Sequence, residues 1–283
     1  MSDQGISIGL QAGVLLEKYG FHFSHSLGQN FLMDDRFVQK MVQSAQVCAG
    51  ENVLEIGPGA GVMTRCLLET GANVTAVELD QSLKPVLEEM LAGQPRAKLI
   101  FADAMKLDPG EVFGGENYRV VANLPYYITT DMILHLLRAQ KKPDSITVLV
   151  QKEAAQRMDA DMKSKSWCAL SATVQYFGQC EALMDVPPEF FTPRPHVDSV
   201  LMRINLYEEK PVQARDDGQL LELIRGAFFM RRKTFANNLT AVFGMSREKA
   251  VSLLQECGLD AKIRGEAVTL AQLCLLSDRM SGK

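Results

Sequence analysis

Between about residues 51 and 206, short runs of β-branched residues alternate with longer stretches of helical periodicity. Strands and helices in this order build βαβ units, whose strands lie parallel in one sheet. Strands are predicted at 52–56, 73–77, 98–101, 119–122 and 145–150, with later ones near 181–186 and 198–204, and helices between them at 62–69, 84–91 and 130–138. The sequence therefore predicts an α/β, Rossmann-like domain with a mostly parallel sheet of seven strands.

The strand pattern ends near residues 208–216, and only helical periodicity follows. Before that point, residues 187–195 hold four prolines, which neither continue a helix nor donate to a sheet, so this segment is predicted to be an ordered loop or a disordered linker. Helices are predicted at 219–229, 233–243, 246–257 and 269–280, with Ser246 and Thr269 as N-caps. We therefore expect a catalytic domain at 1–210 and a small helical domain at 211–283.

Composition excludes several classes of protein. The six cysteines form no C-x-x-C pair and do not cluster with the four histidines, so neither a metal site nor a disulfide scaffold is expected. No apolar run approaches the roughly 20 residues of a membrane span, and the first residues lack a secretory signal, so a cytoplasmic protein is expected. The net charge of −4 divides into +3 from residue 212 onward and −7 before it. The basic C-terminal part is the part suited to contact nucleic acid.

A glycine-rich turn follows the first predicted strand of the α/β region. Gly57, Gly59 and Gly61 let the chain bend sharply and let a ligand approach the backbone closely. Glu78 ends the next strand, 21 residues after Gly57, where a carboxylate can accept hydrogen bonds from ribose hydroxyls. Asp103 ends the third strand and is placed to accept a hydrogen bond from an adenine amino group. Together they predict a site for an adenosine-containing cofactor.

Two cofactor classes use a glycine turn followed by an acidic residue. The dinucleotide fingerprint is G-x-G-x-x-G, whereas here Val62 stands where the third glycine would fall. Glu55, two residues before the turn, suits the methionine end of S-adenosylmethionine. The pattern favours S-adenosylmethionine, which leaves as S-adenosylhomocysteine, over the nicotinamide dinucleotide of an oxidoreductase.

The fourth strand ends in Asn123-Leu124-Pro125-Tyr126. An exocyclic amino nitrogen of adenine is a poor nucleophile because its lone pair is delocalised into the ring. The Asn123 side-chain oxygen and the Leu124 carbonyl, held by the stiff Pro125, can accept both amino hydrogens and so localise that lone pair. Tyr126 can stack on a base that has left its helix. The motif therefore predicts methylation of an exocyclic amine, with no need for a strong general base.

With these motifs the chain resembles the S-adenosylmethionine-dependent ribosomal RNA adenine dimethyltransferases, over nearly its whole length. Three segments resemble the bacterial small-subunit branch of that family: 26–32 (SLGQNFL), 191–199 (FTPRPHVDS) and 231–239 (RRKTFANNL). The resemblance implies that Asn30 and Leu32 close over the cofactor, whose site Gly57, Glu78, Asp103 and Asn123 complete. It also implies that Phe191 forms the second aromatic face around the flipped adenine, opposite Tyr126.

The implied substrate is 16S ribosomal RNA in the immature 30S subunit, where two adjacent adenosines near the 3′ end each receive two methyl groups from a monomeric enzyme. Arg231, Arg232 and Lys233 are implied to contact RNA phosphates. Residues 24–26 (SHS) depart from the family, which usually has lysine or arginine there, and 163–170 (KSKSWCAL) lacks a common Tyr-Gly pair. Three alternatives stay open: a large-subunit (23S) methyltransferase of the antibiotic-resistance type, a ribosome-assembly factor whose binding matters more than its catalysis, and an oxidoreductase that binds a dinucleotide.

Overall fold

The computed structural model describes residues 7–24 and 27–281. The chain forms two compact units. Unit 1 contains the residues up to Ala155 together with Glu181–Leu206, and unit 2 contains Gln156–Cys180 together with the residues from Tyr207 onward. The sequence predicted a boundary at residues 210–211, with residues 156–180 in the first domain, whereas the structure places them in unit 2. That division into a cofactor-binding and an RNA-binding domain stays a prediction about function.

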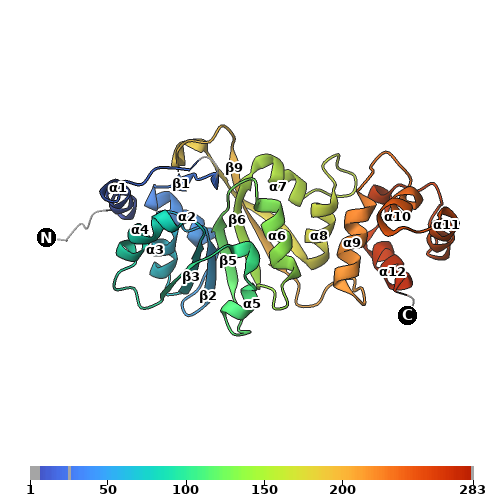
Figure 1. The fold of residues 1–283 in the computed structure, drawn as a ribbon, viewed down its shortest axis with the longest axis horizontal. Helices are drawn as coiled ribbons and strands as arrows, with labels where there is room; N and C mark the ends of the chain where they lie inside the picture. The colour runs from blue at the N-terminus through green and yellow to red at the C-terminus, as the bar shows by residue number, and fades with distance from the viewer. Residues whose placement is uncertain (1–6, 25–26, 282–283) are drawn as a thin grey trace. The chain divides into compact units, whose positions relative to one another are not determined.

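Unit 1 is built on a seven-stranded sheet in the order β4-β3-β2-β5-β6-β9-β7, drawn in Figure 1. Strands β2 to β6 are parallel, and β9 runs antiparallel to β6. This confirms the α/β fold class and the mostly parallel sheet predicted from the alternating pattern. The strands of the sheet are β2 (Asn52–Ile56), β3 (Asn73–Glu78), β4 (Ala97–Phe101), β5 (Arg119–Asn123), β6 (Ser145–Gln151), β7 (Gly178–Val186) and β9 (Ser199–Leu206).

The central strands of the sheet are buried on both of its faces. All seven residues of β6 but the last are buried, as are the last four of β2. In Figure 1, α2, α3 and α4 lie on one side of the sheet and α5 and α6 on the other. The helices of unit 1 are α1 (Ile8–Lys18), α2 (Asp35–Ser44), α3 (Val62–Glu69), α4 (Lys84–Met90), α5 (Pro109–Val112) and α6 (Thr129–Arg138), with 3-10 turns η2 (Gln81–Leu83), η3 (Ala104–Lys106) and η4 (Pro188–Phe190). Helix α7 (Lys152–Met158) joins the two units.

The direction of winding reverses between β2 and β5. The chain passes from β2 outward to β3 and β4, then returns to β5 beside β2 and continues outward to β6. In open α/β sheets, ligands bind at such a switch point, beyond the carboxyl ends of the strands. The proline-rich segment is ordered: it forms η4 and then β8 (Phe191–Thr192), which pairs antiparallel with β1 (Phe31–Leu32).

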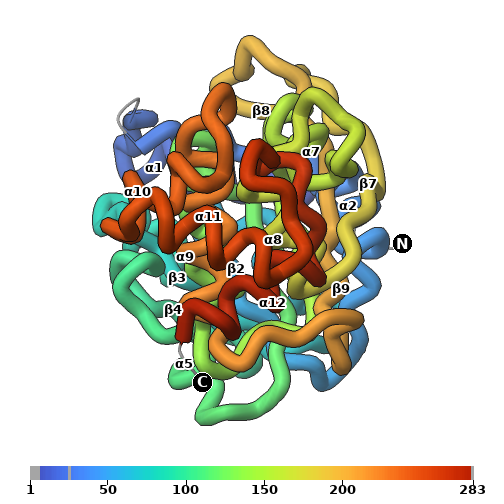
Figure 2. The backbone as a smooth tube through the Cα atoms, turned by 90° about the vertical axis from the view of Figure 1, so that its right-hand side faces the viewer, coloured from blue at the N-terminus to red at the C-terminus, as the bar shows by residue number. Residues whose placement is uncertain are grey.

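Unit 2 consists of helices, as the loss of the strand pattern predicted. Helix α9 packs against α8, α10 and α12, and Figure 2 looks onto this group of helices. Ser246 and Thr269 cap α11 and α12 as expected, each accepting a backbone hydrogen bond from the residue three positions later. The helices are α8 (Ala169–Phe177), α9 (Asp217–Ala227), α10 (Phe235–Phe243), α11 (Arg247–Glu256) and α12 (Leu270–Met280), with the 3-10 turn η5 (Gly265–Ala267).

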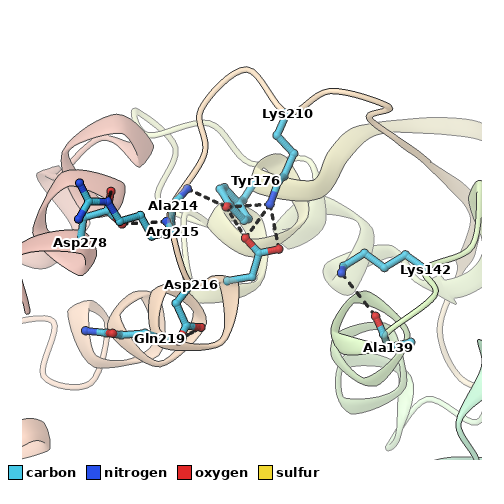
Figure 3. Close-up of polar contacts among 10 residues, drawn as sticks. Ala139, Lys142, Tyr176, Lys210, Ala214, Arg215, Asp216, Gln219 and Asp278 are labelled. Carbon is cyan, nitrogen blue, oxygen red and sulfur yellow. Dashed lines mark hydrogen bonds and ion pairs between the residues drawn. The ribbon is translucent and has the colours of Figure 1, made fainter. Parts of the chain in front are cut away.

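A polar cluster around the buried Tyr176 ties α8 to the start of α9 and explains why residues 156–180 belong to unit 2. The fully buried Tyr176 donates its hydroxyl proton to Asp217 Oδ1 at 2.6 Å and accepts from the Ala214 backbone at 3.1 Å. Lys210 donates to both carboxylate oxygens of Asp217, at 2.6 and 2.8 Å, and its Nζ lies 4.3 Å from the Tyr176 ring centroid. Figure 3 shows Lys210 reaching over Tyr176 to make these contacts. Hydrogen bonds to charged partners at these distances fix the segment between β9 and α9.

Candidate active site

A cavity of about 300 Å³ opens at the switch point, beyond the carboxyl ends of the parallel strands. The segment after β5, the ends of β2 and β3, the turn after β4 and the segment before α2 all line it. Most of its wall is apolar, and the polar groups are few, which is typical of a small-molecule site. The lining residues lie at 27–31, 56, 57, 59, 77–79, 102–105, 123–128 and 132.

Gly57 and Gly59 of the predicted glycine turn line the cavity. Gly57, Gly59 and Gly61 have φ angles of +70°, +58° and +81°, a region that side chains with a Cβ rarely adopt. A Cβ on Gly59 would stand 2.8 Å from the Phe31 ring, so the absence of a side chain there also lets Phe31 lie directly on the turn.

Glu78 is buried and points at the glycine turn. Its carboxylate accepts hydrogen bonds from the backbone of Gly59 at 3.1 Å and of Asp80 at 2.9 Å, and burial raises its pKa. Asp103 lies across the cavity at the end of β4, where its Oδ1 accepts from the Met105 backbone at 3.0 Å and its Oδ2 lies 3.6 Å from Lys106. The structure therefore brings both predicted acids to one cavity, with Leu79 and Met105 as exposed apolar neighbours.

Glu55 lies behind the turn and does not line the cavity. It is fully buried, and neither carboxylate oxygen has a hydrogen-bond partner among the described residues. Burial raises its pKa to about 8, with a smaller contribution from the nearby charge of Glu78, although the neighbouring Thr64 hydroxyl acts to lower it. Burial of this kind favours the neutral form of the carboxyl, and a cation bound beside the turn would favour its charged form.

The segment before α2 forms one wall of the site. Asn30 donates its side-chain amide to the Gly28 carbonyl at 3.1 Å, and its own carbonyl accepts from Asn123. Gln29 spans to Asp80 with a hydrogen bond of 2.7 Å. Leu32, predicted to close over the cofactor, is instead buried in the core in β1 and does not line the cavity. His25 and Ser26, which belong to the segment that departs from the family, lie outside the described residues.

Asn123 stands at the end of β5 with its amide orientation set by the chain. Its Nδ2 donates to the Asn30 carbonyl at 2.9 Å, which leaves its side-chain oxygen without a partner among the described residues. The Leu124 carbonyl likewise forms no hydrogen bond within the described chain. Both groups belong to residues that line the cavity. The two acceptors that the sequence predicted for an amino group are thus both available at one site.

Tyr126 follows with its hydroxyl 2.7 Å from the Ser199 hydroxyl, and burial raises the pKa of the tyrosine. This hydrogen bond holds the ring at the cavity wall. Phe191, predicted as the opposite aromatic face, is placed elsewhere: its side chain is 4% exposed, belongs to the hydrophobic core and does not line the cavity. Its neighbour Phe190 stacks on Phe37, with ring centroids 3.8 Å apart. The structure therefore does not bring Phe191 and Tyr126 to the walls of one cavity.

The three predicted RNA-contact residues lie in unit 2, in the turn between α9 and α10, and all three are exposed. Arg231 pairs with Glu266 at 3.2 Å. Across residues 7–24 and 27–281, no group of histidine, cysteine or acidic side chains could hold a metal ion. The same residues contain no helix long and apolar enough to cross a membrane.

Comparison with known proteins decides between the cofactor classes. The family model described as ribosomal RNA adenine dimethylase matches residues 20–280. The chain belongs to this family. Its members are S-adenosylmethionine-dependent methyltransferases that act on adenine in ribosomal RNA, so the chain is a methyltransferase and the alternative of an oxidoreductase is excluded.

A Clostridium perfringens relative named ribosomal RNA small subunit methyltransferase A is 43% identical over 265 residues, which is 93% of each chain. A relative of the same name from Lachnoclostridium phytofermentans is 41% identical over 276 residues, 95% of each chain.

Two solved structures share the fold. A dimethyladenosine transferase from Plasmodium falciparum aligns with a TM-score of 0.69 at 22% identity, covering 85% of this chain and 94% of its own. The 23S rRNA methyltransferase ErmE aligns with a TM-score of 0.64 at 25% identity, covering 89% and 99%. Both support a Rossmann-like domain with a helical region after it.

The residues around the cavity fit a bound S-adenosylmethionine. The positive φ angles of the glycine turn leave room for a ligand at the backbone, and Glu78 and Asp103 offer acceptors at the cavity. Sequence reasoning gave no role to Gln29, Phe31 or Ser199, although all three lie in the segments that carry the family resemblance. Their residue types do not reveal these contacts, because the partners Asp80, Gly59 and Tyr126 are distant from them in the chain.

Proposed function

We propose that this chain transfers methyl groups from S-adenosylmethionine to the exocyclic amino groups of two adjacent adenosines. The RNA is the 3′-terminal hairpin loop of 16S ribosomal RNA in the immature 30S subunit, and S-adenosylhomocysteine is the other product. The relatives named small subunit methyltransferase A support the choice of subunit, because they are 41–43% identical over at least 93% of the chain. ErmE, named for the 23S RNA, is 25% identical. A small-subunit substrate implies action in the cytoplasm, and we propose that the enzyme acts as a monomer.

The orientation of the Asn123 amide is the observation that carries this proposal. Because Nδ2 is held by the Asn30 carbonyl at 2.9 Å, the side-chain oxygen must face away from that contact and is left as an acceptor. With the Leu124 carbonyl it offers two acceptors to the two hydrogens of an adenine amino group. Pro125 limits the freedom of the chain between Asn123 and Tyr126, so both acceptors are fixed before the substrate arrives.

When bound, S-adenosylmethionine supplies an electrophilic methyl group on a sulfonium ion. The task of the protein is to make the amino nitrogen nucleophilic. Accepting both hydrogens pulls this nitrogen toward tetrahedral geometry and localises its lone pair, and the two acceptors stabilise the positive charge that develops as the new bond forms. The methylated nitrogen is acidic and loses its proton to solvent, so no strong base is required of the chain.

Several side chains orient the reactants. Tyr126, anchored by Ser199, offers an aromatic face for the flipped base, since stacking on the ring takes the place of stacking on the neighbouring bases of the helix. Glu78 and Asp103 hold the ribose and the adenine of the methyl donor, and Asn30 closes the cavity beside them. Leu32 and Phe191 pair with each other in the β1–β8 ladder, which supports this wall. Arg231, Arg232 and Lys233 contact RNA phosphates, which position the substrate without reading its sequence.

Asn123→Ala tests the proposal. With labelled donor and undermethylated small subunits, we expect the turnover rate to fall by about 100-fold or more, because one of two fixed acceptors is removed. Affinity for S-adenosylmethionine, measured by calorimetry, should change little. Asn117→Ala, an exposed asparagine before β5, is the matched control and should keep full activity. Full turnover by Asn123→Ala would refute the assignment.

The same assay separates the alternatives. Label that enters undermethylated large subunits and not small ones would establish the 23S type of activity and refute our choice of substrate. An Asn123→Ala variant that binds small subunits normally but does not methylate them would show that binding and catalysis are separable. A wild-type protein that binds small subunits and never transfers label to them would establish a non-catalytic assembly factor.

A further inference from the structure

Phe229 is the most exposed of the large apolar side chains in the described part of unit 2, with 63% of its surface accessible. It lies in the turn between α9 and α10, one residue after Phe228 and two before Arg231. Burial of an apolar ring stabilises a protein, and an exposed ring does not provide this stabilisation. A single exposed apolar residue is common, so its surroundings decide whether it has a function.

The turn that carries Phe229 is fixed by tertiary contacts at both ends. The last carbonyl of α9, of Ala227, accepts a hydrogen bond of 2.8 Å from the fully buried Asn238, and Gly265 packs so closely against Ala227 that no Cβ would fit. Phe228 turns inward and meets the edge of the Trp167 ring, with centroids 6.0 Å apart. Phe229 is therefore presented outward from a rigid turn, and little conformational entropy is lost when it binds.

The surface around the turn is basic. Arg231 donates a hydrogen bond of 3.4 Å to the Lys165 carbonyl. This contact joins the turn to residues 163–165, which belong to the Gln156–Cys180 part of unit 2. Lys163, Lys165, Arg232 and Lys233 are exposed and pair with no acidic side chain among the described residues. Glu266 is the one acid that pairs with Arg231 in the described part of the chain, at 3.2 Å. Asp161, whose carboxylate accepts from the backbone of Lys163 and Ser164, lies in the same segment. A face with more cations than acids suits a polyanion and opposes burial of this surface against the same face of a second copy.

We propose that Phe229 is a stacking platform for an unpaired RNA base, held beside a phosphate-binding surface formed by residues 163–165 and 231–233. Cations that track a phosphate backbone around an exposed aromatic ring are the arrangement by which proteins bind single strands. A paired helix offers its phosphates but keeps its base faces covered, so only an unpaired or splayed base can use the ring. This inference deepens the proposed function, because it rests on RNA as the substrate and names the structural feature recognised.

Two probes test it with the full-length protein: a 20-nucleotide oligoadenylate and a 20-base-pair RNA duplex, bound at several salt concentrations. Phe229→Ala should weaken binding to oligoadenylate by between about fivefold and about 150-fold. The slope of log K against log salt should not change, since every phosphate contact is kept. Duplex affinity should stay within about twofold of wild type, and Phe229→Trp should restore binding to oligoadenylate.

Arg232→Gln gives the opposite signature and serves as an internal comparison. It should weaken binding to both probes and lower the salt slope by about one unit. Leu275→Ala removes another exposed apolar side chain of unit 2, 44% accessible on α12, and should change nothing. In this design any adenine that enters the catalytic cavity contributes equally to all variants.

Each other outcome overturns the inference. If Phe229→Ala binds oligoadenylate as the wild type does, or loses both probes equally, the ring does not stack on unpaired bases. If its affinity falls only for whole small subunits and not for oligoadenylate, Phe229 contacts a protein. Failure here leaves methyl transfer by the wild type intact, so it is distinguishable from failure of the proposed function.

Discussion

The buried carboxyl of Glu55 predicts how the stability of unit 1 depends on pH. Its side chain is fully buried with no hydrogen-bond partner among the described residues, and its pKa is raised to about 8 from the usual 4.5. The folded protein then holds this proton at pH values where the unfolded chain has released it. The contribution of the Glu55 carboxyl to the free energy of unfolding is fully present below pH 4.5 and is lost as the pH rises toward 8.

The size of the effect follows from the shift. The rise of the pKa from 4.5 to about 8 corresponds to about 5 kcal/mol over the whole range, and about half of it falls between pH 5 and pH 7. Glu55→Gln replaces the carboxyl by a neutral group of the same shape. We therefore expect the variant to lack this part of the fall in unfolding free energy, whatever its stability at any single pH.

Urea unfolding of the ligand-free protein, followed by circular dichroism at pH 5, 6, 7 and 8, measures the difference. Trp167, the one tryptophan of the chain, lies in unit 2, so its fluorescence does not report directly on unit 1. Glu88→Gln, whose side chain is 59% exposed on α4, is the matched control and should follow the wild type. Parallel pH curves for wild type and Glu55→Gln would mean that Glu55 is charged in the fold, and the reasoning from burial would be wrong.

Three further predictions concern the site and unit 2. Glu78→Gln should weaken S-adenosylmethionine binding by about 10- to 100-fold in calorimetry, because hydrogen bonds to a charged acceptor are lost; an unchanged affinity would refute the ribose assignment. Ser199→Ala should lower turnover while donor affinity stays constant, because the Tyr126 hydroxyl loses its partner; equal turnover would show that the ring needs no anchor. Tyr176→Phe should destabilise unit 2 by about 1–3 kcal/mol in urea unfolding read by Trp167 fluorescence, since the Ala214 backbone donor and Lys210 lose an acceptor; a wild-type midpoint would contradict the role of the cluster.

The central part of the fold is predictable from sequence because its signals are local. The predicted strand at 52–56 and helix at 62–69 match β2 and α3 residue for residue, since an apolar run, a glycine turn and a helical period follow one another there. The N-caps Ser246 and Thr269 were predictable for the same reason. Strands β1 and β8 were not, because each has two residues and forms only by pairing across about 160 residues of chain.

The site also contains residues that local sequence predicts and residues whose positions depend on long-range pairing. Gly57, Glu78, Asp103 and Asn123 follow consecutive strands, so a parallel sheet brings them together whatever the details of packing. The position of Phe191 depends on the pairing of Phe31 with Thr192 and of Leu32 with Phe191, which local pattern does not reveal. Helix α8 was also missed, because its β-branched and aromatic residues, 169–177 (ALSATVQYF), have weak helix propensity and the helix is stabilised by its buried contacts.

Mass spectrometry of the RNA from undermethylated small subunits, after incubation with the protein and S-adenosylmethionine, tests the central claim most directly. The account predicts four added methyl groups, two on the exocyclic nitrogen of each of two adjacent adenosines in the 3′-terminal loop. With Asn123→Ala under the same conditions, the methyl groups should be added at least about 100-fold more slowly. Methyl groups on ring nitrogens, on ribose, on a base other than adenine, or in the large subunit alone would contradict it.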